Sequence, residues 1–418
     1  MSASMTTTVG RVKLTDLAPE LLLAVLEFCP DVASLKNAAD AHPTLYHLFH
    51  VYQNHLATQI LRNELSEVYT HARVSFLAGQ ITLERFNSLG PNDIDIDEGV
   101  RKITDLKASL CNISMTSAIS ILRLHREVVE LADVCVQDCP ETLEQSLTPF
   151  RNSLTTRRPS RSERIRIQQA IYLFEILRNL CNKMCVESDK TPTYYADTYL
   201  LLGELHLALL EHSLAPWEMY QVIAIQAFFR RALFGFERDE YRNERVIPGF
   251  LSYGIHFLHK AICTIDASKR RNFLRPYEQK IIGQPIHALG VALSRGSRNN
   301  WTRKQLKPLD EYKPFFSGDG FGIQMWMKIE AEQLALYNAN LQSNGMFDYE
   351  VTRLEGRLDL WSAALWDVSR WEDIVPTLRH PMPEWWFGIQ HHCDPVDMTF
   401  HLAKHPDMAW MRQENAVG

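Results

Sequence analysis

Residues 93–99, Asp-Ile-Asp-Ile-Asp-Glu-Gly, gather carboxylates that could bind a cation. An EF-hand calcium loop needs glycine at its sixth position and glutamate at its twelfth. Glu98 and Thr104 occupy those positions here, so we interpret the stretch as an acidic loop that caps the next helix. The enzymatic alternative is an all-helical, Mg²⁺-dependent site for an isoprenoid diphosphate, with Asp93 and Asp97 as candidate ligands. That site needs carboxylates at helical spacing on facing helices. The three aspartates here alternate with isoleucine, so their side chains point to one side only if the chain is extended, which argues against this site.

A second group of metal-binding residue types lies near the C-terminal end and comprises His391, Cys393, His401 and His405. His401 and His405 are four residues apart and would share one face of a helix, as zinc ligands can. The spacing to Cys393 fits no common zinc finger, and no Cys-x-x-Cys pair occurs in the chain. We therefore expect histidines that are solvated or packed against aromatic rings, and we expect no metal and no cofactor.

Signatures of catalysis are missing from the sequence. Gly318, Gly320 and Gly322 alternate, but no predicted strand precedes them and no lysine follows, so they indicate a loop rather than a phosphate-binding site. Neither Gly-x-Ser-x-Gly nor His-Glu-x-x-His occurs. The sequence therefore predicts a protein that is not an enzyme.

Composition narrows the class of protein further. Of the 418 residues, 46% are apolar and 22% are charged, which is enough to bury a core, and eight cysteines are too sparse for a disulfide scaffold. The net charge of −6 argues against general nucleic-acid binding, which needs a basic face. No apolar run is long enough for a signal peptide or for a membrane span of about 20 residues. We expect a protein of the cytoplasm, the nucleus or both, with no nucleic-acid or membrane partner.

Helical periodicity dominates the chain and predicts an all-α fold. Apolar residues recur at steps of three and four from Ile121 to Cys135 and from Ile167 to Met184, and each set marks one buried stripe of a helix. Cys135 and Cys181 lie on these stripes, which favours core packing over metal binding. Further helices are predicted at residues 199–214, 222–236, 250–265, 279–294, 323–341 and 352–366.

Three segments are predicted to be loops. Residues 88–99 are acidic and bounded by glycine and proline, and residues 308–322 are also rich in these two residue types. Residues 155–164 are basic, and we interpret them as an exposed loop in which Ser160 or Ser162 could be phosphorylated.

The N-terminal sequence predicts three helices in quick succession, the first two of them short. Pro19 suits the first turn of a helix, and Glu20 favours the positive end of its dipole. This helix is apolar around most of its circumference, so it must bury one face in its own domain and another against a partner. A second helix is predicted at about 31–40, and after His42-Pro43 a long third helix is predicted from Thr44 to about residue 70.

This arrangement resembles the F-box, in particular the F-box-like proteins of filamentous fungi, which often begin Leu-x-x-Leu-Pro-Pro-Glu-Leu-Leu. The matching residues are Leu14, Leu17, Pro19, Glu20, Leu21 and Leu22, with Ala18 in place of the first proline. Leu35 falls at the leucine of the second helix, and Tyr46 falls where the family often has tryptophan. The sequence Leu-Trp-Asp-Val-Ser-Arg-Trp-Glu-Asp-Ile within residues 360–374 is similar to a tail of the same proteins.

The resemblance implies a substrate-recruiting subunit of a cullin-type (SCF) ubiquitin ligase, in which residues 14–49 bind a Skp-type adaptor and the body presents an unknown protein substrate. The helix-in-groove contact with the adaptor would use Leu14, Leu17, Pro19, Glu20, Leu21, Leu22, Val25, Leu26 and Leu35. Two alternatives stay open, namely a helical protein-interaction scaffold without a ligase role and the Mg²⁺-dependent enzyme described above.

The expected organisation has four parts. A flexible tail at 1–12 precedes an F-box-like module at 13–71, an irregular multi-helix body at 72–375 and a C-terminal tail at 376–418. Six of the nine tryptophans follow residue 360, and we expect this aromatic, proline-rich region to pack on the body. If a surface for a further partner exists, its candidate residues are Phe315, Phe316, Trp385 and Trp386.

Overall fold

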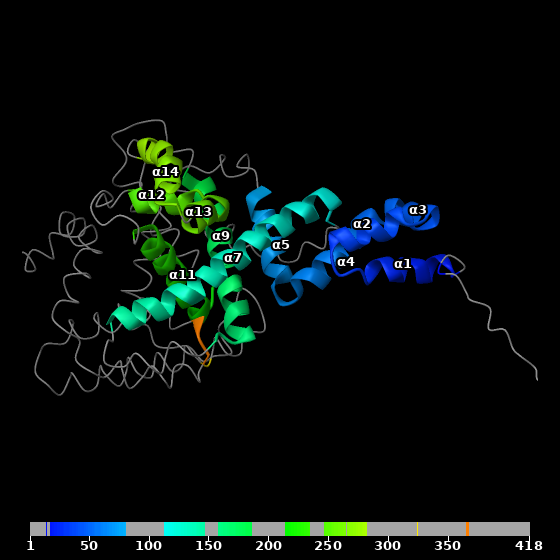
Figure 1. The fold of residues 1–418 in the computed structure, drawn as a ribbon, viewed down its shortest axis with the longest axis horizontal. Coiled ribbons are helices and arrows are strands. Elements are labelled where there is room, and N and C mark those ends of the chain that lie inside the picture. The colour runs from blue at the N-terminus through cyan, green and yellow to red at the C-terminus, as the bar shows by residue number, and fades with distance from the viewer. Residues whose placement is uncertain are drawn as a thin grey trace, which may run out of the picture.

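The described part of the chain is built from helices and contains no strand, which confirms the all-α prediction (Figure 1). This computed structural model describes residues 14, 17–80, 113–146, 158–185, 214–234, 246–264, 266–281, 324 and 365–367. Several predictions lie outside those residues, including the tail at 1–12, the acidic loop at 88–99, the helices at 199–214 and 323–341, the loop at 308–322 and the tail at 376–418. No helix within the described ranges combines the length and the apolar character that crossing a membrane would require.

Three short helices open the described chain, and the first two agree with the prediction. They are α1 (Pro19–Glu27), α2 (Val32–Asp40) and α3 (Pro43–Val51). Proline occupies the first turn of α1 and of α3, where its missing N–H costs no hydrogen bond. The Asp31 carboxylate caps α2 by accepting a hydrogen bond of 2.7 Å from the Ser34 N–H, and His42 Nδ1 caps α3 by accepting from the Thr44 N–H.

The predicted long helix from residue 44 to about 70 is wrong in detail. The chain breaks at Tyr52 between α3 and α4 (Gln53–Leu65), and a 3₁₀ turn (Ser66–Val68) then separates α4 from α5 (Tyr69–Gln80). Ser66 has a φ of 45°, a conformation that a continuous right-handed helix cannot contain. Apolar spacing continues across both breaks, which is why periodicity alone predicts a single helix.

The first helices enclose a small core of their own. It is formed by Leu22, Leu26, Cys29, Leu35, Leu45, Leu48, Leu56 and Ile60, all of them buried. We call α1–α3 together with this face of α4 the N-terminal module. Ala57, Leu61 and Leu65 on the other side of α4 belong instead to the main core. One helix therefore supplies side chains to two cores, and this joins the N-terminal module to the rest of the protein.

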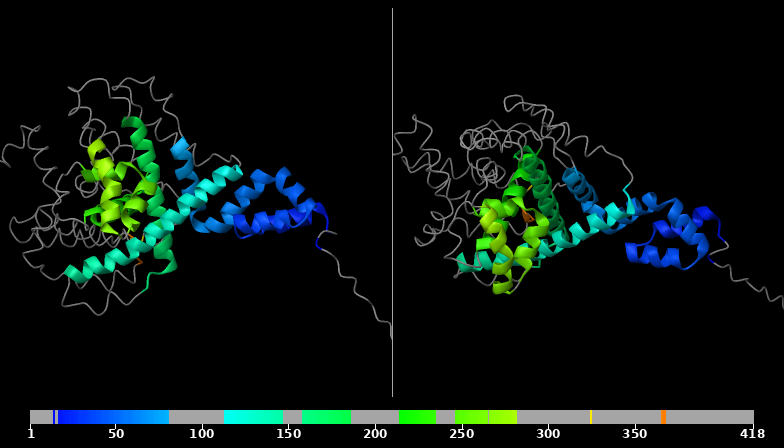
Figure 2. Two further views of the ribbon diagram at one scale, coloured as in Figure 1. Left: turned by 45° about the horizontal axis from the view of Figure 1, so that its top comes forward. Right: turned by 90° about the horizontal axis from the view of Figure 1, so that it is seen from above.

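The body packs around one central helix, α9 (Arg161–Cys185), which contacts α5, α7 (Met115–Ser146) and α11 (Pro216–Phe234). Two further views show α1–α3 at one end of the described molecule and α11–α14 at the other, with α4 and α5 between them (Figure 2). Helix α7 begins beside α4 and α5 and runs along α13 to the far end. The predicted stripes of α7 and α9 face the core: Ile121, Val128, Leu131, Cys135, Ile167, Ile171, Phe174 and Leu177 are all buried.

The predicted helix at 250–265 is interrupted. Here α12 (Val246–Ser252) ends and α13 (Ile255–Cys263) begins after Gly254, and α14 (Ala267–Ile281) follows, earlier than the predicted 279–294. Gly254 has a φ of 85°, and a Cβ there would lie 2.7 Å from the Arg178 guanidinium. Arg178 donates to the Ser252 carbonyl, and Glu175 accepts from the Ile255 N–H, so α9 holds both sides of the break.

The half-buried His125 should make the stability of the protein depend on pH. His125 Nδ1 lies 3.0 Å from the Tyr172 hydroxyl, and burial lowers the pKa of His125 from 6.5 to about 4. Between these two values the unfolded chain binds the proton that the folded protein excludes. Acidification from pH 6.5 towards 4 should therefore cost up to about 3 kcal/mol of unfolding free energy through this group.

Urea unfolding of the protein and of a His125→Gln variant at pH 7 and pH 5 measures this contribution. The variant should lose less stability on acidification than the unchanged protein, because its side chain binds no proton in this range. Equal losses in the two proteins would contradict the assignment.

Candidate functional site

Helix α1 carries two apolar stripes that face different surroundings. Leu22, Leu26 and Cys29 form a stripe that is buried in the N-terminal module. Leu21, Val25 and Phe28 follow the same four-then-three spacing one position earlier, and they are 54%, 37% and 85% exposed. We call Leu21, Val25 and Phe28 the exposed α1 stripe. Large apolar side chains at such spacing on a helix are what a hydrophobic groove of a partner protein recognises.

The structure divides the nine residues predicted at an adaptor contact. Three of them are at most 1% exposed and lie in the core of the N-terminal module: Leu22, Leu26 and Leu35. In the folded module their side chains are therefore not available to a partner. Leu17 is half-buried against the same core. The other five predicted residues are exposed: Leu14, Pro19, Glu20, Leu21 and Val25.

Phe28 is the residue at this surface that the sequence analysis missed. It stands at the C-terminal end of α1 and is the most exposed of the large apolar side chains in the described ranges. Its spacing of seven from Leu21 and three from Val25 was the available signal, because these positions share one helix face. Tyr46 on α3, the residue at the family's tryptophan position, is also exposed, with its ring centroid 4.4 Å from that of His50.

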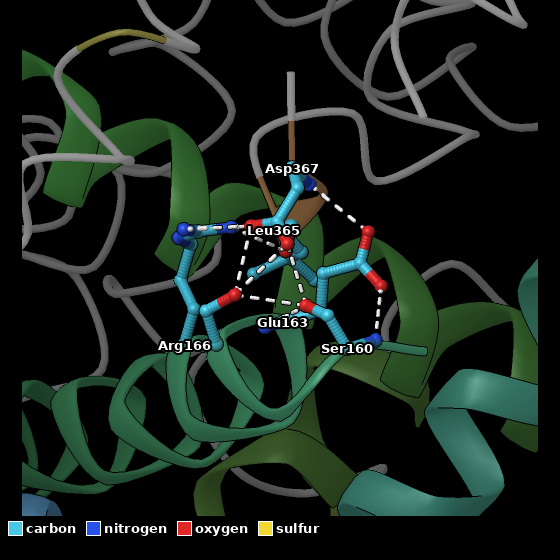
Figure 3. Close-up of polar contacts among 6 residues, drawn as sticks. Ser160, Glu163, Arg166, Leu365 and Asp367 are labelled. Atoms are coloured by element: carbon cyan, nitrogen blue, oxygen red, sulfur yellow. Dashed lines mark hydrogen bonds and ion pairs between the residues drawn. The ribbon is translucent and has the colours of Figure 1, made fainter. Parts of the chain in front are cut away.

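A cluster of polar side chains lies at the N-terminal end of α9 (Figure 3). It is far from α1 in the sequence and in space (Figure 1). Ser160 and Glu163 form a capping box: the Ser160 N–H donates to Glu163 Oε2 over 2.8 Å, and the Glu163 N–H donates to Ser160 Oγ over 3.1 Å. The pattern Ser-x-x-Glu is present in the sequence and could have revealed this helix start.

The capping box also binds a segment that lies about 200 residues later in the chain. The Asp367 carboxylate accepts hydrogen bonds from Ser160 Oγ at 2.5 Å and from Ser162 Oγ at 2.8 Å, and the Asp367 N–H donates to Glu163 Oε1. Arg166 donates to the Leu365 carbonyl and lies 3.3 Å from Asp367 Oδ1 (Figure 3). We call these residues the Asp367 anchor.

Electrostatics in the Asp367 anchor favour the charged form of its carboxylate. Burial by itself would raise the pKa of Asp367, but hydrogen bonds from Ser160 and Ser162 and the charge of Arg166 outweigh burial and hold that pKa below its usual range. The Arg166 side chain is only 2% exposed, so the pair is largely removed from solvent. A buried, hydrogen-bonded pair of this kind joins two distant segments in one defined geometry.

The Asp367 anchor corrects one prediction from the sequence. Residues 155–164 were expected to form an exposed loop, but α9 begins at Arg161, and the side chain of Glu163 is buried. Ser160 and Ser162 donate to Asp367 instead of lying open to solvent. Arg161 and Arg164 do remain exposed, each beside an acidic side chain. Trp366 is 2% exposed and packs into the main core.

The remaining candidate residues lie outside the described ranges. These are Phe315, Phe316, Trp385 and Trp386 of the possible partner surface, Asp93 and Asp97 of the enzymatic alternative, and His391, Cys393, His401 and His405. Comparisons of the chain with known protein families, with curated proteins and with solved structures find no match.

Proposed function

We propose that the protein is a non-enzymatic, substrate-recruiting subunit of a cullin-type ubiquitin ligase, and that its N-terminal module binds a Skp-type adaptor. The exposed α1 stripe is the observation that carries this proposal. A helix that buries one apolar stripe and exposes a second one has a free face suited to the groove of another protein. The F-box resemblance of residues 14–49 identifies the class of partner, and the cullin scaffold would be reached through the adaptor.

The position of the N-terminal module also supports a recruiting role. It lies at one end of the described molecule, away from α11–α14 (Figure 1). Its first three helices have their own core, and α4 connects that core to the main core through side chains on both of its faces. An adaptor bound at α1 would therefore leave the far end of the body accessible to a protein substrate.

We expect Phe28→Asp and Leu21→Asp each to abolish binding of the full chain to the Skp-type adaptor of the same organism. The reason is that a carboxylate would be buried in an apolar groove without a partner. Pull-down with purified proteins, followed by titration calorimetry, measures the loss. Both side chains are more than half exposed in the free protein, so the melting temperature should stay close to that of the unchanged protein.

Ile119→Asp is the matched control, because Ile119 is an exposed apolar residue on α7 and lies outside α1–α3. It should leave adaptor binding unchanged. Binding that persists in the two α1 variants would refute the assigned surface. A folded full chain that does not bind the adaptor at all would favour the scaffold without a ligase role.

A further inference from the structure

Helices α7 and α13 are joined by two histidine–carboxylate pairs with the same spacing on both helices. His256 Nδ1 lies 2.7 Å from Glu127 Oε1, and His259 Nε2 lies 2.6 Å from Glu130 Oε2. Each pair is three residues from the next along both helices, so corresponding side chains meet on adjacent turns. The two pairs are chemically alike, but among the described residues only the second has a further metal-binding side chain beside it.

Cys263 lies one turn after His259 on the same face of α13. Its Sγ, a ring nitrogen of His259 and a carboxylate oxygen of Glu130 all lie within 4.8 Å of one another. Thiolate sulfur, imidazole nitrogen and carboxylate oxygen are three donors that Zn²⁺ accepts in tetrahedral sites. A separation of a few ångströms between donors is close to what one ion bound to all three requires, so small side-chain rotations would complete the geometry.

The electrostatics at this point suit a divalent cation. Burial, and after it the charge of Glu130, raises the pKa of the Cys263 thiol to about 11, so the thiol keeps its proton at neutral pH. A divalent cation bound between the two groups would reverse both effects, because a coordinating thiol is deprotonated. The thiolate and the Glu130 carboxylate would then match the two positive charges of the ion. Glu130 is half exposed, which gives an ion access from solvent.

We propose that Glu130, His259 and Cys263 form a zinc site between α7 and α13, with the fourth coordination position open to water. The site would fasten α13 to α7 and thereby stabilise the body. It is independent of the adaptor contact proposed for α1, since it uses no residue of the N-terminal module. A site with three protein ligands and one open position also has the composition of zinc centres that bind an exchangeable fourth ligand.

The test uses Co²⁺ as the probe in the full chain after removal of metals by a chelator. A Co²⁺–thiolate bond produces a charge-transfer absorption band, and tetrahedral coordination produces intense visible bands, so both the cysteine ligand and the geometry are observed directly. We expect these bands in the unchanged protein at one Co²⁺ per chain, and we expect Zn²⁺ to displace them.

Three variants test whether Co²⁺ binds at Glu130, His259 and Cys263 and not elsewhere in the chain. Cys263→Ser should lose the charge-transfer band. His259→Ala should weaken Co²⁺ binding by about 100-fold or more, because removing a direct ligand should cost at least as much as removing a residue that only orients a ligand. His256→Ala is the matched control, because it removes the neighbouring histidine–carboxylate pair, which has no cysteine beside it among the described residues, and it should keep the band. Absence of the band in the unchanged protein, or its survival in Cys263→Ser, would overturn the proposal. Melting temperatures recorded without metal show whether each variant is folded.

Discussion

Replacing Leu22 by alanine should destabilise the N-terminal module by about 3 kcal/mol, whereas replacing its neighbour Leu21 should change stability by less than about 0.5 kcal/mol. The two leucines are adjacent on α1, but Leu22 is 1% exposed and Leu21 is 54% exposed. Truncation of Leu22 removes apolar contacts and leaves a cavity among the side chains of α1–α4. Truncation of Leu21 creates no cavity and only reduces the apolar surface that is exposed to solvent, so stability changes little.

Hydrogen exchange of the amides in α1–α4 measures this difference as a free energy of local opening. Together with the adaptor pull-down, this experiment separates the two roles of α1, because Leu22→Ala should lower the protection of the module while Leu21→Asp should leave protection unchanged and impair adaptor binding. Equal protection in the two alanine variants would mean that the burial pattern of α1 is assigned to the wrong face.

Replacing Asp367 by alanine should lower the free energy of unfolding of the body by about 3 kcal/mol. The change removes a carboxylate from beside the Arg166 guanidinium, which is 2% exposed, and it removes the acceptor for the hydroxyls of Ser160 and Ser162. A buried charge that loses its counter-charge retains the cost of desolvation without the compensating attraction. The midpoint of urea unfolding of the full chain is the measurement.

Arg161→Ala is the control for this experiment. Arg161 is on the same helix and pairs with Glu67, but the two side chains are 79% and 49% exposed. Water and salt screen such a pair, so its loss should cost less than about 0.5 kcal/mol. Asp367→Asn should fall between the two variants, because the amide oxygen still accepts a hydrogen bond but carries no charge. If Asp367→Ala unfolds at the same urea concentration as Arg161→Ala, the Asp367 anchor does not stabilise the body.

Local features of the fold could be predicted from the sequence. The three-and-four spacing from Ile121 to Cys135 and from Ile167 to Leu177 correctly indicated which sides of α7 and α9 face the core. Pro19 correctly indicated the start of α1. These signals depend on a few neighbouring residues and on the 3.6-residue repeat, so no knowledge of the tertiary structure is needed. The breaks at Tyr52 and Gly254 were missed because the apolar spacing runs through them and because the contacts of Arg178 and Glu175 hold the second one in place.

The sequence by itself determined that the protein is built from helices and that α1 is apolar on more than one side. Only the tertiary structure decided which stripe of α1 is buried, since that depends on where α2–α4 pack. It also decided that Asp367 contacts Ser160 and that Glu130 lies beside His259 and Cys263. The physical reason is that periodicity reports the character of each helix face, whereas contacts between residues more than 100 positions apart arise only when the helices pack together.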